Sequence, residues 1–143
     1  MSDPEASFVV VDASIWVSRL VPQDSFHPAV KAWTTLQRSK SVVFLSPALL
    51  LPEIAGAIAR RTGDSILAQQ AVGMLQNLSE LRLVEMDHSM IQEAADLAAN
   101  LKLRGADSIY VSLAKRLTIP LATLDNEQKD KAATIVTVLE IEP

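Results

Sequence analysis

Residues 8–16 of the chain read FVVVDASIW. The run from Phe8 to Val11 is rich in β-branched residues, which favours a strand, and the residues after Asp12 have the pattern of a short helix. A strand that leads directly into a helix is the repeating unit of α/β folds. This stretch therefore predicts the fold class, and it places an acidic residue where the strand ends.

The same order of strand and helix recurs along the rest of the chain. Further apolar runs predict strands at 42–45, 81–85, 120–123 and 135–138, with segments of helical spacing between them. Because nearly every residue of these strands is apolar, we expect a mostly parallel central sheet of about five strands with helices on both faces.

Helix boundaries can also be predicted. Pro47 is expected to open a helix that runs to about Arg61 and is closed by Gly63, and Asp64 is a candidate cap for the next helix. The pair Arg104-Gly105 is expected to stop a later helix, before another that runs from 107 to 117.

The length of 143 residues and the 49% of hydrophobic residues suit one domain, which we expect over residues 8–143. Residues 1–7, MSDPEAS, are expected to be a short flexible leader, because they are polar and acidic rather than a secretory signal. The apolar stretch 42–59 is interrupted by Pro47, Pro52 and Glu53, so no membrane span is expected. With no cysteine in the chain, the cytoplasm is the expected location.

Four acidic residues stand out as candidates for chemistry. Asp12 and Asp125 follow predicted strands, where ligands bind in open parallel sheets, and Asp107 precedes a predicted helix. Glu53 is the only charged residue between Lys40 and Arg60, so burial is expected to raise its pKa or to require a partner. Each aspartate alone could equally be a helix cap, and Glu53 could be an exposed residue of a first helical turn.

Taken together, the four acids point to a metal site. Four carboxylates within reach of one another cannot all stay ionised without a cation. The chain has no cysteine and only two histidines, so an all-oxygen site for Mg²⁺ or Mn²⁺ is expected and zinc is disfavoured. The net charge of −4 argues against broad electrostatic capture of nucleic acid, unless a bound cation and local Lys and Arg residues compensate for it.

Three stretches, in this order, resemble the PIN-domain family, and specifically the VapC toxins of toxin–antitoxin pairs. They are VVVDASIW at 9–16, LSPALLLPEIAGAIAR at 45–60 and RGADSIYVSLAKRLTIPLATLDNEQ at 104–128. The resemblance implies a three-layer α/β/α domain that cleaves RNA with Mg²⁺ or Mn²⁺ held by Asp12, Glu53, Asp107 and Asp125. Within the same motifs, Ser14, Thr123 and Glu127 are possible supporting residues.

The resemblance also implies partners and a reaction. The reaction would be hydrolysis of an RNA phosphodiester by metal-activated water, with one or two cations. A small antitoxin would hold the enzyme inactive by occupying its acidic groove and inserting a helix nearby. The apolar surface of the predicted helices at 28–36 and 47–59 further suggests a homodimer.

Other functions stay open at this point. A standalone PIN-domain nuclease that processes RNA would carry the same acids as a toxin. A non-catalytic interaction domain would keep them for structure alone, and would show neither metal uptake nor RNA cleavage. A phosphoryl-accepting α/β domain also places an aspartate after a strand, but dehalogenase-like enzymes need a second Asp where this chain has Ser14.

Overall fold

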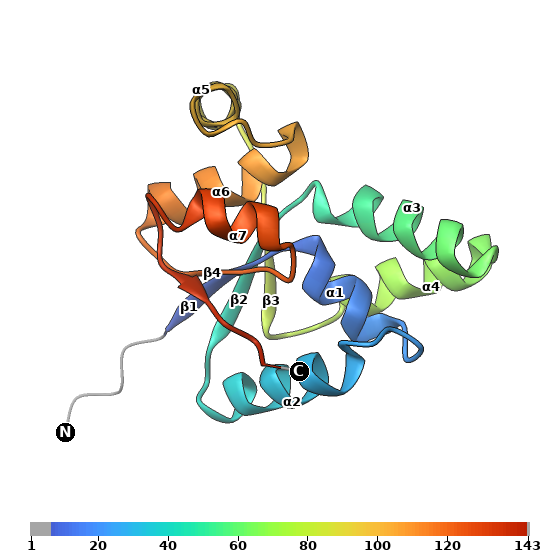
Figure 1. Cartoon of the computed structure of the whole chain (residues 1–143). Helices are drawn as coiled ribbons and strands as arrows, with labels where there is room; N and C mark the ends of the chain where they lie inside the picture. Colours follow the sequence, from blue (N-terminus) through green and yellow to red (C-terminus); the bar gives the residue numbers. More distant parts are fainter. Residues whose placement is uncertain (1–6, 143) are drawn as a thin grey trace.

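The computed structural model describes residues 7–142. Its centre is a sheet of five parallel strands in the order β3-β2-β1-β4-β5, so the first strand of the chain lies in the middle (Figure 1). The strands are β1 (Phe8–Val11), β2 (Val43–Pro47), β3 (Leu81–Val84), β4 (Leu121–Ala122) and β5 (Val138–Leu139). The predicted parallel sheet is therefore confirmed.

Strand β1 explains why the strands are apolar on both faces. Successive side chains of a strand point to opposite sides of the sheet. Val9 and Val11 accordingly belong to one buried cluster with Phe44, whereas Val10 belongs to a second cluster with Leu121. The central strand thus fills two cores at once, and this arrangement requires a layer of helices on each face.

Seven helices cover the sheet within residues 7–142. They are α1 (Ala13–Leu20), α2 (His27–Ser39), α3 (Leu50–Thr62), α4 (Ser65–Gln76), α5 (His88–Leu101), α6 (Gly105–Leu117) and α7 (Asn126–Ala132). Helices α1 to α4 contribute to the core of Val9 and Val11, and α5 to α7 contribute to the core of Val10. The three-layer α/β/α architecture is confirmed, and α3 and α4 extend from it as a helical pair (Figure 1).

Two predicted boundaries are confirmed in atomic detail. Helix α3 ends at Gly63, which adopts a left-handed conformation with φ of 71°. The Asp64 side chain then accepts hydrogen bonds from the backbone N–H groups of Ile66 and Leu67, and so caps α4. A residue without a Cβ atom followed by an acidic cap turns the chain sharply between two packed helices.

Three other boundaries differ from the prediction. Pro47 does not open a helix, because it pairs with Val84 as the last residue of β2, and α3 begins at Leu50. Helix α5 ends before Arg104-Gly105, because Lys102 takes the left-handed cap position with φ of 56°, and Gly105 begins the next helix instead. The last strand begins at Val138 rather than at Ile135, because the backbone N–H groups of Ile135 and Val136 still bond to Ala132 at the end of α7.

No helix within residues 7–142 is long and apolar enough to cross a membrane. The predicted leader falls on residues 1–7, and residues 1–6 lie outside the described residues. The proposed extent of the domain, 8–143, stays a prediction.

Candidate functional site

Asp12 lies at the carboxyl end of β1 and caps α1. Its Oδ2 atom accepts hydrogen bonds from the backbone N–H of Ser14 at 3.2 Å and from the Thr123 hydroxyl at 3.0 Å. Only 5% of the residue is exposed. Burial raises the pKa of Asp12, and the hydrogen bonds from Ser14 and Thr123 oppose that shift. Asp12 is therefore a helix cap and also a buried carboxyl group at the edge of the sheet.

Glu53 lies in the first turn of α3, half-buried and facing α6. Its Oε1 atom accepts a short hydrogen bond of 2.6 Å from the hydroxyl of Tyr110. Burial raises the pKa of Glu53, the charges of Asp12 and Asp107 raise it further, and the Tyr110 hydrogen bond lowers it. The partner of this carboxyl is thus a tyrosine of another helix.

Asp107 lies in the first turn of α6, and Asp125 is the N-cap of α7. Burial and the charge of Asp12 raise the pKa of Asp107, while Arg104 opposes the shift. Asp125 Oδ1 accepts from the backbone N–H of Gln128 at 3.1 Å and so caps α7. Both aspartates thus have a helix-terminal role in addition to any chemical one.

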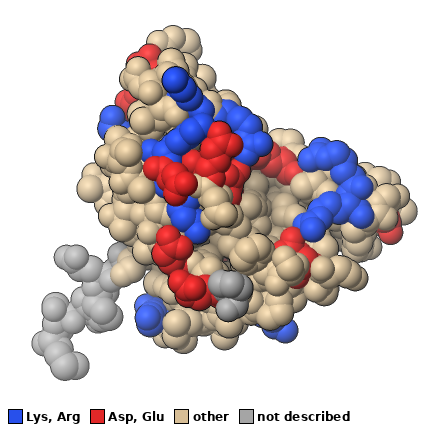
Figure 2. All heavy atoms as spheres, viewed as in Figure 1, with Lys and Arg blue, Asp and Glu red and all other residues tan. Residues whose placement is uncertain are grey.

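The structure brings the four predicted acids to one edge of the sheet. The charge of Asp12 acts on both Glu53 and Asp107, and one arginine bridges Asp107 and Asp125. Figure 2 shows acidic side chains gathered over the region of α6 and α7, with basic side chains beside them and further basic ones over α3 across a hollow. We call Asp12, Glu53, Asp107 and Asp125 the acidic quartet.

The bridging arginine is Arg104, the residue before α6. Its Nε atom donates to Asp107 Oδ2 at 3.1 Å, and its Nη2 atom donates to Asp125 Oδ2 at 2.6 Å. The sequence predicts Arg104 as part of a helix stop and does not predict this role. Its separation from Asp107, three residues along one helical face, is the signal that could have suggested it.

Tyr110 and Gln128 are two further residues that the sequence did not single out for the site. Tyr110 is fully buried, and burial together with the neighbouring Glu53 raises the pKa of its hydroxyl, which therefore stays protonated as a donor. Gln128 is also buried. Its Oε1 lies 3.0 Å from the Thr123 hydroxyl and shares the single proton of that group with Asp12, and its Nε2 donates to the Asp107 carbonyl at 3.3 Å. These side chains connect α3, α6, α7 and the end of β4.

The three predicted supporting residues have different surroundings. Thr123 is buried and hydrogen-bonds to Asp12, and Ser14 Oγ accepts from the backbone N–H of Leu124 at 3.0 Å. Glu127 instead forms an exposed ion pair of 2.6 Å with Lys131, which lowers the pKa of Glu127. Thr123 and Ser14 therefore support the geometry around Asp12, whereas Glu127 points to a different partner.

The donor set of the quartet fits a hard divalent cation. Carboxylate oxygens are the ligands that Mg²⁺ and Mn²⁺ prefer, and three of the four carboxyl groups have raised pKa values in the protein without metal. Among residues 7–142, however, no three acidic or histidine side chains already stand close enough to hold a metal ion. Binding would therefore require side-chain rearrangement, above all where Asp107 and Asp125 contact Arg104.

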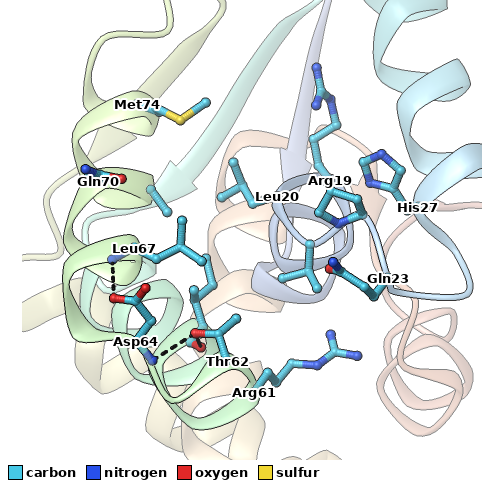
Figure 3. A pocket seen from close by; sticks show the side chains of 14 residues that line it. Arg19, Leu20, Gln23, His27, Arg61, Thr62, Asp64, Leu67, Gln70 and Met74 are labelled. Atoms are coloured by element: carbon cyan, nitrogen blue, oxygen red, sulfur yellow. Dashed lines mark hydrogen bonds between the residues drawn. The ribbon is translucent and has the colours of Figure 1, made fainter.

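A large groove lies away from the quartet. It is a groove of about 980 Å³ between the end of α1, the following loop, α3 and α4 (Figure 3). Leu67 and Met74 of α4 line it and are 44% and 61% exposed. None of the quartet lines this groove, so it is a surface separate from the acidic site.

Solved structures of three toxin or toxin–antitoxin proteins have similar folds. VapC20 of Mycobacterium tuberculosis, a toxin that cleaves the sarcin-ricin loop, has a TM-score of 0.75 at 20% identity, covering 92% of this chain and 99% of that one. VapBC2 of Rickettsia felis, bound to promoter DNA, has a TM-score of 0.71 at 13% identity, covering 92% of this chain and 97% of that one. DNA-bound VapBC of Salmonella typhimurium has a TM-score of 0.68 at 11% identity, covering 94% of this chain and 97% of that one.

At these identities the likeness shows the fold alone, and no functionally curated protein matches the sequence. The sequence model of the PIN domain matches residues 9–133, a stretch that begins in β1 and includes the whole acidic quartet. Because that match spans most of the chain, and the parallel sheet and its helices agree with it, the protein belongs to the PIN-domain family.

Proposed function

We propose that the protein is a metal-dependent endoribonuclease that hydrolyses RNA phosphodiester bonds with Mg²⁺ or Mn²⁺. The observation that carries this proposal is the juxtaposition of Asp12, Glu53 and Asp107. Burial raises the pKa of each of them, the charge of Asp12 further raises the pKa values of Glu53 and Asp107, and a divalent cation would relieve both effects. Membership of the PIN-domain family supports the same reading.

Each residue has a role in this proposal. Asp12 and Asp107 are the core metal ligands, and Glu53 and Asp125 complete the site or orient the attacking water. Thr123 holds Asp12 through its hydroxyl, and Tyr110 holds Glu53. When bound, the cation supplies charge stabilisation for the attacking and leaving oxygens of the phosphodiester.

The test of this site is a pair of matched cap variants. Asp12→Asn removes a carboxylate from the quartet, whereas Asp87→Asn changes the N-cap of α5, which accepts from the Met90 backbone N–H at 2.9 Å. We expect Asp12→Asn to lose most RNA cleavage with Mg²⁺ and Asp87→Asn to retain it, with both variants folded. Full activity of Asp12→Asn would refute the assignment.

We further propose that the nuclease is a VapC-type toxin that acts in the cytoplasm and is inhibited by a small antitoxin. The similarity to structures described as VapBC complexes supports this proposal. The groove beside α3 and α4 is the candidate antitoxin surface, because its exposed Leu67 and Met74 suit the apolar face of a helix. If the protein is a toxin, its expression is expected to arrest growth, and the product of the adjacent gene is expected to relieve that arrest. A standalone RNA-processing nuclease would cleave RNA without arresting growth.

A homodimer stays part of the proposal. The outer side of α2 presents Leu36, which is 50% exposed, beside Pro28 and Ala32. An exposed apolar face of this kind suits contact with a second copy. Light scattering is expected to give a dimer mass for the wild type and a smaller mass for Leu36→Asp.

A further inference from the structure

Arg104 occupies part of the acidic quartet with its own positive charge. Its guanidinium donates to Oδ2 of Asp107 at 3.1 Å and to Oδ2 of Asp125 at 2.6 Å. Both contacts are charge-assisted hydrogen bonds, which are stronger than hydrogen bonds between neutral groups. A single planar group therefore joins the first turn of α6 to the cap of α7.

The local sequence gives no other reason for this placement. Arg104 is the N-cap of α6 but makes no side-chain capping hydrogen bond, and a cation at a helix N-terminus opposes the helix dipole. Its side chain is 71% exposed, so burial of its stem does not hold it there. The two carboxylates account for the position of the guanidinium.

The same two oxygens are needed by a metal ion. Asp107 and Asp125 belong to the proposed ligand set, and a carboxylate oxygen that accepts a hydrogen bond from Arg104 must exchange that bond for a metal bond. Two cations in one small site also repel each other. Arg104 and a divalent cation are therefore alternatives at this end of the quartet.

We propose that Arg104 is an internal counter-ion that holds Asp107 and Asp125 together in the metal-free protein and is displaced when the metal binds. This inference rests on the proposed function, because it assumes that the quartet binds a divalent cation. Its consequence is that Arg104 stabilises the metal-free fold and at the same time weakens metal binding. The metal affinity of the protein is thus set partly by a residue that is not a ligand.

Calorimetric titration of chelator-treated protein with Mn²⁺ tests the competition. Arg104→Gln removes the charge but keeps a similar length, and we expect its Kd for Mn²⁺ to fall about three- to fivefold relative to wild type. The matched control is Arg61→Gln. Arg61 forms a similar exposed ion pair, with a distance of 2.8 Å between its Nη1 atom and Asp24 Oδ2, and this pair does not involve the quartet. Its Kd for Mn²⁺ should equal that of the wild type.

Thermal unfolding in chelator provides the second measurement. Arg104→Gln should melt below the wild type without metal and gain more on addition of Mn²⁺, whereas equal melting in chelator contradicts the counter-ion role. If both proteins bind Mn²⁺ and the variant binds it no more tightly than the wild type does, Arg104 does not compete with the metal, and the proposed function stands. If neither binds Mn²⁺, both the competition and the proposed metal-dependent function are wrong.

Discussion

The hydroxyl of Tyr110 donates a hydrogen bond of 2.6 Å to Oε1 of Glu53, across 57 positions of sequence. It joins a buried residue of α6 to the one charged residue in the first half of α3. Burial and the neighbouring Glu53 raise the pKa of this hydroxyl, so the hydroxyl is the donor in this contact. One oxygen of the Glu53 carboxylate is thereby held against α6.

Tyr110→Phe should keep the fold and weaken the site. Loss of the donor removes the interaction that lowers the pKa of Glu53, so this carboxyl should be protonated at higher pH than in the wild type. Residues that orient ligands typically contribute about 10- to 100-fold to metal affinity or activity. Mn²⁺ titration should show a higher Kd and RNA cleavage should fall; an unchanged Kd and rate would show that the hydrogen bond is only structural.

Asp12→Asn should stabilise the metal-free protein at neutral pH. Because burial raises the pKa of Asp12, the folded state holds its proton more tightly than the unfolded state does. The contribution of the wild-type carboxyl to stability is fully present below the pKa of the unfolded state, about 4, and is lost as the pH rises through the folded value.

The variant cannot ionise at this position, so its stability advantage should grow from mildly acidic to neutral pH. Denaturant unfolding in chelator, measured for both proteins at several pH values, gives this difference directly. A difference that does not change with pH would contradict the burial of an ionisable Asp12.

Gln128→Leu should destabilise the protein and loosen the site. The buried amide connects the Thr123 hydroxyl to the Asp107 carbonyl. Leucine removes both contacts, and the Thr123 hydroxyl keeps only Asp12 as an acceptor. Loss of a partner for a buried polar group costs about 1–3 kcal/mol. Urea unfolding measures the loss of stability relative to the wild type, and the folded variant should bind Mn²⁺ more weakly. If the two proteins are equally stable, the hydrogen bonds of the amide do not contribute to stability.

Gly63 and Gly73 form a matched pair that tests the α3 and α4 hairpin. Gly63 has a φ of +71°, so Gly63→Ala places a Cβ in a strained left-handed conformation and should cost about 1 kcal/mol. Gly73 lies inside α4 with nothing within 4 Å of an added Cβ. Gly73→Ala should therefore stabilise the protein by about 0.5–1 kcal/mol, and thermal melts of the two variants should shift in opposite directions.

Charged substitutions in the groove should separate antitoxin binding from catalysis. Leu67→Asp or Met74→Asp changes an exposed apolar side chain of α4 and leaves the quartet intact. We expect that the proposed antitoxin no longer inhibits these two variants and that they cleave RNA as the wild type does when no antitoxin is present. Ile91→Asp, at an exposed position of α5, is the control and should remain inhibited. Inhibition of the α4 variants at the wild-type antitoxin concentration would place the antitoxin elsewhere.

Much of the fold could be predicted because it depends on local patterns. The β-branched run before Asp12 and the turn at Gly63 and Asp64 act within a few residues, and the structure confirms both. The last strand could not be placed from its apolar residues alone, since Ile135 and Val136 continue the hydrogen bonding of α7. The competing partner of those N–H groups is visible only in three dimensions.

The site was predicted as a set of acids and not as a network. The positions of the quartet follow from the ends of strands and the starts of helices. Tyr110 meets Glu53, and Arg104 reaches Asp125, only because the fold brings α6 close to the start of α3 and to the N-terminus of α7. The spacing of Arg104 and Asp107 suggests a local ion pair but not the contact with Asp125, and a tyrosine in an apolar helix suggests packing.

RNA cleavage before and after removal of divalent cations tests the central claim most directly. Chelator-treated protein should be inactive on a single-stranded RNA, and addition of Mg²⁺ or Mn²⁺ should restore cleavage with a rate that rises as the metal site fills. The products should carry no 2′,3′-cyclic phosphate, because water rather than the ribose hydroxyl attacks. Cleavage that persists in excess chelator, or that yields cyclic phosphate ends, would contradict a metal-dependent ribonuclease.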